Sequence, residues 1–72
     1  MNKARRKEIR NTVVGLRNVV QDILDDEADA FDNMPESLQE SENGIISQEA
    51  QENLEAAVDA LEEAISYLEE IV

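Results

Sequence analysis

The chain has 72 residues, a formal net charge of −12, and neither cysteine nor histidine. Its length allows one small domain at most, and the missing side chains exclude disulfides, thiolate metal sites, cysteine nucleophiles and the commonest general base. An apolar fraction of 42% is high enough for folding, whereas only Phe31 and Tyr67 are aromatic, which argues against a base-stacking platform for nucleic acids.

The first predicted element is an amphipathic helix over residues 2–32. Four apolar residues recur every seven positions in it: Ile9, Leu16, Ile23 and Ala30. This repeat is typical of a helix that packs one side against a partner. Asn2 can cap its N-terminus. Gly15 lies within the helix, either at a close approach between helices or as a tolerated surface glycine.

The next segment, residues 33–46, is predicted to be a connection that contains one short helical turn. Asn33 followed by Pro35 is typical of a helix start, and residues 41–44 are predicted to form a turn because Asn-Gly tolerates positive φ. Three apolar residues accompany this segment: Phe31, Met34 and Leu38. They either cap the end of a helical bundle or form an apolar patch with an acidic rim that binds a partner.

The last predicted element is a long helix over residues 47–72, with Ser47 as its N-cap. Leucine recurs every seven residues, at Leu54, Leu61 and Leu68. Other apolar residues follow three positions later, at Ala57, Ala64 and Ile71, and four positions later, at Val58, Ile65 and Val72. This apolar surface is wider than the narrow seam of a simple coiled coil.

Together these elements predict an all-α fold, an antiparallel αα-hairpin with a short helical turn in the connection. Two facing helices cover only part of such wide apolar surfaces. In a monomer we expect partial exposure of five flanking residues: Val13, Val20, Val58, Ile65 and Val72. We therefore expect self-association, as a homodimer that forms a four-helix bundle.

Charge is divided unevenly along the chain, because all six basic residues lie among the first 17. An antiparallel hairpin would place Arg5, Arg6 and Arg10 beside the acids of the C-terminal end: Glu62, Glu63, Glu69 and Glu70. This pairing favours the antiparallel topology. Alternatively, Arg5, Arg6 and Arg10 bind a small anionic ligand such as a signalling nucleotide.

The last helix carries a stripe of eight acids at helical spacing: Glu49, Glu52, Glu55, Asp59, Glu62, Glu63, Glu69 and Glu70. Such a stripe either keeps the protein in solution or imitates a phosphate backbone and binds a host protein. Direct nucleic-acid binding is not expected at this net charge. We expect no enzymatic activity, because no nucleophile has a base beside it. We also expect no metal and no cofactor.

Three parts of the sequence resemble a family of short, acidic, helical proteins encoded by phages and prophages of Gram-positive bacteria. These are residues 1–7 (MNKARRK), residues 30–39 (AFDNMPESLQ) with Ser41 and Glu42 after them, and the ending rich in LEEAI. The resemblance covers essentially the whole chain and implies a small helical phage protein. It supplies no catalytic or binding residues.

This resemblance favours a protein that binds and inhibits a host protein, as an anti-defence or host-takeover factor, for example by DNA mimicry. The alternative is a structural oligomerisation module or assembly helper whose acids only keep it in solution. A third possibility is a sponge for an anionic nucleotide signal at the basic N-terminal end. No apolar run approaches the length of a membrane span, so we expect a cytoplasmic protein, in the host cytoplasm if it is phage-encoded.

Overall fold

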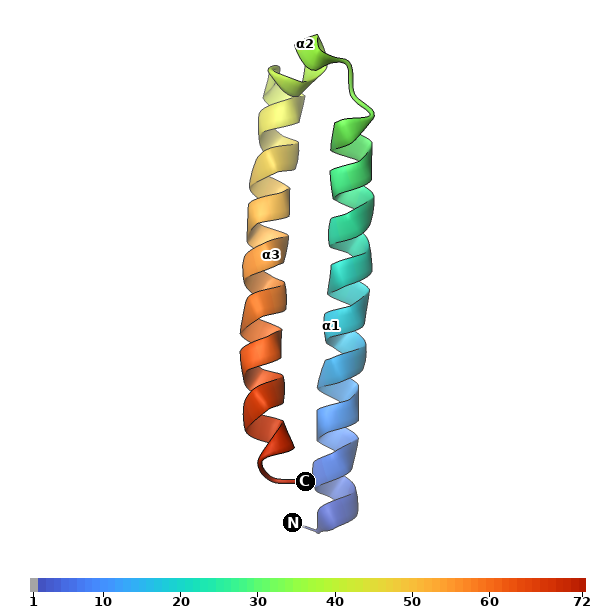
Figure 1. Ribbon diagram of the computed structural model, residues 1–72, viewed down its shortest axis with the longest axis vertical. Coiled ribbons are helices and arrows are strands. Elements are labelled where there is room, and N and C mark those ends of the chain that lie inside the picture. The colour runs from blue at the N-terminus through green and yellow to red at the C-terminus, as the bar shows by residue number, and fades with distance from the viewer. Residues whose placement is uncertain (1) are drawn as a thin grey trace.

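The computed structural model describes residues 2–72, which form three helices: α1 (Lys3–Asp32), α2 (Glu36–Gln39) and α3 (Glu42–Glu69). The two long helices pack side by side and run in opposite directions, and α2 lies at the end remote from the two termini (Figure 1). Residues 2–72 contain no strand, so the predicted all-α class is confirmed. The Cα atoms span 55 × 14 × 12 Å, so the molecule is an elongated rod.

The start of α1 agrees with its prediction, whereas the start of α3 does not. Asn2 caps α1, because its Oδ1 accepts a hydrogen bond of 2.9 Å from the backbone N–H of Arg5. The N-cap of α3 is Ser41, not Ser47, and the residues predicted as a turn lie in its first helical turn. Gly44 has no positive φ there. The N-cap therefore lies six residues earlier than predicted, and Ser47 is an interior residue of α3.

In the connection, Asn33 is the C-cap of α1 and Pro35 is the N-cap of α2, so the short helix starts two residues later than predicted. The Gln39 side chain joins the segments, because its Nε2 donates to the backbone oxygens of Phe31, at 3.0 Å, and Met34, at 3.3 Å. These bonds satisfy carbonyl groups that the end of α1 leaves without helical partners.

The two long helices contact each other along a seam of buried and half-buried residues, which recur at spacings of three and four. On α1 the seam residues are Arg6, Arg10, Val13, Arg17, Val20, Leu24, Glu27 and Phe31. On α3 and the residues after it they are Gly44, Ser47, Gln51, Leu54, Val58, Leu61, Ile65, Leu68 and Val72. An average spacing of 3.5 residues is typical of coiled-coil packing.

The side of α1 that contacts α3 differs from the predicted side. Leu16 and Ile23 were expected to face the partner helix, yet they are 51% and 50% exposed, and Ile9 is exposed as well. Val13 and Val20, predicted to flank the contact, lie within it, and Val58 of α3 is only 5% exposed. The prediction was wrong because the two apolar stripes of α1 differ by one residue, or roughly 100° of helix rotation. Both have the same heptad period, so periodicity alone does not distinguish them.

The two glycines occupy contrasting sites. A Cβ at Gly15 would have no neighbouring atom within 4 Å, so this residue is a surface glycine and not a close approach between helices. A Cβ at Gly44 would overlap the backbone carbonyl group of Gln39. Only glycine therefore lets the chain fold back from α2 into the first turn of α3.

Candidate interaction surfaces

A polar contact crosses the seam near its α2 end. Ser47 is 4% exposed, and its Oγ donates a hydrogen bond of 2.7 Å to Oε1 of Glu27 on α1. A hydrogen bond to a carboxylate is stronger than one between neutral groups. Because such a polar pair is satisfied only when these two residues meet, it helps to fix the register of the two helices. Sequence reasoning missed this pair because it placed Ser47 at a helix start.

Two ion pairs link the helices closer to the termini. Nη1 of Arg10 lies 3.0 and 2.9 Å from the two carboxylate oxygens of Glu69, and Nη1 of Arg17 lies 3.2 Å from Oε1 of Glu62. The contact between Arg10 and Glu69 agrees with the predicted antiparallel charge pairing, whereas the partner of Arg17 was not predicted. Both arginines occupy seam positions, and their side chains are only 25% and 33% exposed.

These ion pairs lie on one broad side of the helix pair, which we call the polar face. Its residues each follow a seam residue by one position, and most are polar: Asn11, Asn18, Gln21 and Asp25 on α1, and Glu52, Glu55, Asp59, Glu62 and Glu69 on α3, with Val14, Ala28 and Ile45 as apolar members. All eight acids of the predicted stripe are exposed. The structure places five of them on the polar face, while Glu49, Glu63 and Glu70 lie at heptad positions on the outer edge of α3, away from α1.

The opposite broad side, which we call the apolar face, is built from residues that each precede a seam residue. On α1 these are Ile9, Thr12, Leu16, Val19, Ile23, Asp26 and Ala30. On α3 and after it they are Ile46, Ala50, Asn53, Ala57, Ala60, Ala64, Tyr67 and Ile71. Because the helices run in opposite directions, the same one-residue displacement directs both stripes to the same side. Val19, Ile46 and Tyr67 are 55%, 55% and 65% exposed. An exposed apolar surface of this kind, although Thr12, Asp26 and Asn53 interrupt it, is typical of an interaction site.

Comparison with protein-family models, with curated proteins and with solved structures found no match. The resemblance to phage proteins thus stays a prediction from the residues. Within residues 2–72, no helix is long and apolar enough to cross a membrane.

The three predicted tip residues do not form one surface. Phe31 and Met34 are half-buried, and their backbone carbonyl groups share the Gln39 side chain. Leu38 of α2 is 49% exposed. The tip therefore has two half-buried apolar side chains, Phe31 and Met34, and one exposed apolar side chain, Leu38.

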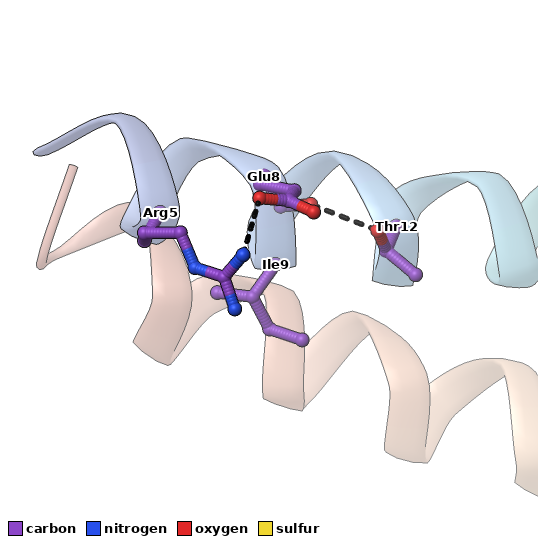
Figure 2. Close-up of a pocket in the computed structure, with 4 residues that line it drawn as sticks. All are labelled: Arg5, Glu8, Ile9 and Thr12. Carbon is purple, nitrogen blue, oxygen red and sulfur yellow. Dashed lines mark hydrogen bonds and ion pairs between the residues drawn. The ribbon is translucent and has the colours of Figure 1, made fainter. Parts of the chain in front are cut away.

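The basic end does not collect its arginines around an open anion site. A shallow pocket of about 230 Å³ is lined by Arg5, Glu8, Ile9 and Thr12. Figure 2 shows the Glu8 carboxylate directed at the Arg5 guanidinium, at a distance of 3.3 Å. This carboxylate would repel an anion in the same pocket. Arg10 meanwhile pairs with Glu69, and Arg6 is half-buried in the seam.

Proposed function

We propose that this chain is a non-catalytic protein-interaction module, an αα-hairpin that pairs with a second copy through its apolar face and forms a four-helix bundle. The observation that carries this proposal is the apolar face itself, which extends over the length of both long helices. Large side chains gain stabilisation when their apolar surface leaves water, at roughly 25 cal/mol per Å².

The small core of the helix pair supports the same proposal. Among residues 2–72, only Leu24, Gly44, Ser47 and Val58 are buried, so one layer of two helices provides a very small core. A domain of this size usually gains stability from a further element or an oligomeric partner. A second layer against the apolar face would supply that missing core.

A pair of matched variants tests the role of the apolar face. Leu16→Glu adds a charge to this face, whereas Asn18→Glu adds the same charge to an exposed residue of the polar face on the same helix. We expect size-exclusion chromatography to show a dimer for the wild type and for Asn18→Glu, and a monomer for Leu16→Glu. Identical elution of all three proteins would contradict the proposal.

A second candidate function concerns the polar face. We propose that its acids bind a basic surface of a host protein, in the manner of a DNA mimic that inhibits its target. Support comes from the acids that no base neutralises. Of the eight stripe acids, Glu62 and Glu69 pair with arginine, and within residues 2–72 the other six form no ion pair. Neighbours at helical spacing lie roughly 5–6 Å apart, which concentrates negative charge along α3.

The binding test uses variants that spare the two ion pairs. Glu52→Gln, Glu55→Gln and Asp59→Asn together remove the charges of the three polar-face acids of α3 that form no ion pair, while Glu36→Gln, Glu40→Gln and Glu42→Gln neutralise three exposed acids near α2 as a control. The immobilised chain should retain a DNA-binding protein from a Gram-positive lysate until salt or competing duplex DNA releases it. Only the first triple variant should lose it. Equal retention by both variants would exclude the polar face as the binding surface.

A further inference from the structure

We propose that the two copies associate with their α2 ends together, so that α1 of each copy packs on α3 of the other. This arrangement rests on the proposed dimer, and it specifies which surfaces meet. Two-fold symmetry allows two ways to place one apolar face on another. An axis parallel to the helices brings α1 against the partner's α3, whereas a perpendicular axis brings α1 against the partner's α1 and α3 against the partner's α3.

The position of each residue along the long axis of the helix pair, which we call its height, distinguishes these two arrangements. The ion pairs Arg10–Glu69 and Arg17–Glu62 join residues of α1 and α3 at about the same height, whereas Ser47 lies five residues closer to α2 than this correspondence would set the partner of Glu27. A parallel two-fold axis does not change height, so the same correspondence holds between copies. Continuing it along the apolar faces sets Thr12 level with Tyr67, Val19 with Ala60, and Asp26 with Asn53.

Side-chain sizes are complementary in this register. The large residues of α1, which are Leu16, Val19 and Ile23, lie level with a run of alanines on α3: Ala57, Ala60 and Ala64. Conversely, the small Thr12 lies level with the large Tyr67. The polar Asp26 meets the polar Asn53, whose side-chain amide can donate to a carboxylate. Alternation of large and small residues across an interface is what permits close packing.

The perpendicular arrangement lacks this complementarity. It would set the large stripe of α1 against itself and the alanine stripe of α3 against itself, which requires two unequal helix separations in one bundle. It would also juxtapose two α3 helices, whose charged residues are all acidic, although all six bases of the chain lie on α1. Like charges that face each other destabilise such a contact.

The area of the apolar face is sufficient for a dimer. The helix pair is 14 Å wide across its Cα atoms, and thirty helical residues extend roughly 45 Å, so the footprint is about 600 Å² per copy. Two copies therefore bury about 1,200 Å², at the lower end of the range for stable interfaces.

Because the chain contains no cysteine, one introduced cysteine gives one spin label per copy. Ser37→Cys places the label on the exposed surface of α2, and Asn18→Cys places it near the middle of α1 on the polar face. Pulsed electron paramagnetic resonance on the full chain then measures the distance between the two labels of a dimer. The Asn18 label reports dimer formation in either arrangement.

We expect a Ser37 label distance of roughly 15–30 Å, since facing helices in a bundle lie about 8–10 Å apart and the labels add their own length. A Ser37 distance near the 55 Å length of the molecule would overturn the proposed arrangement while leaving the dimer intact. Absence of a dipolar signal from both labels would instead overturn the dimer itself.

Discussion

At the scale of single residues, the two glycines have opposite roles in one sequence. Gly15 faces open solvent within a helix, where glycine carries only its conformational cost. Gly44 permits the backbone of α3 to contact Gln39. The sequence left Gly15 open between a close approach and a surface position, and it misassigned Gly44, because Gly44 follows an asparagine and so has the local signature of a turn.

Alanine substitution at the two glycines should therefore change stability in opposite directions. Gly15→Ala should raise the free energy of unfolding by about 1 kcal/mol, because alanine is the better helix former. Gly44→Ala should lower it by about 1–3 kcal/mol, because its Cβ forces the Gln39 backbone to move. Urea denaturation at one fixed protein concentration measures both. A stabilising Gly44→Ala would show that α2 does not fold back on α3 as described.

The buried hydroxyl of Ser47 supports a second residue-scale prediction. Ser47→Ala removes the donor that the Glu27 carboxylate uses, so the free energy of unfolding should fall by about 1.5–3 kcal/mol. Ser66→Ala is a matched control, because Ser66 Oγ donates a hydrogen bond of 3.2 Å to the backbone carbonyl oxygen of Glu62 on the exposed surface of α3. Its change should stay within about 0.5 kcal/mol. Equal effects of the two variants would show that the contact between Ser47 and Glu27 contributes nothing.

At the scale of elements, the sequence predicts helices better than it predicts which side of each helix is covered. Heptad repeats identify the two long helices because both are long and strongly periodic. The same repeats occur twice on α1, displaced by one residue, so the stripe of Leu16 and Ile23 is as regular as the seam of Val13 and Val20. The choice between them depends on contacts between distant residues, such as Arg17 with Glu62, which single-helix periodicity does not contain.

The ion pair between Arg17 and Glu62 permits a direct test of the relation between α1 and α3. A double-mutant cycle with Arg17→Gln and Glu62→Gln should give a coupling energy of about 0.3–1 kcal/mol, which falls when salt screens the charges. The parallel cycle with Glu63→Gln should give none, because Glu63 lies on the outer edge of α3. Coupling of Arg17 to Glu63 instead of Glu62 would mean that α3 is rotated from the described orientation.

At the scale of the whole molecule, the helix pair has two chemically different broad sides. The polar face contains the ion pairs and five of the eight stripe acids, and the apolar face contains most of the large apolar side chains that the seam leaves exposed, with Leu38 on α2 and Ile45 on the polar face as exceptions. Sequence periodicity predicted more apolar surface than two helices cover, but it assigned the partly uncovered part to five residues, of which Val58 is buried and the others are half-buried: Val13, Val20, Val58, Ile65 and Val72. The structure assigns it to Ile9, Leu16, Val19 and Ile23.

The central claim is that a second copy covers the apolar face. Sedimentation equilibrium of the unaltered chain at micromolar concentrations tests it most directly, because it gives the mass of the species in solution without any substitution. We predict a mass twice that of the 8.1 kDa chain, and a thermal midpoint that rises with protein concentration, as mass action requires for a dimer that unfolds to monomers. A mass of 8.1 kDa with a midpoint independent of concentration would contradict the claim.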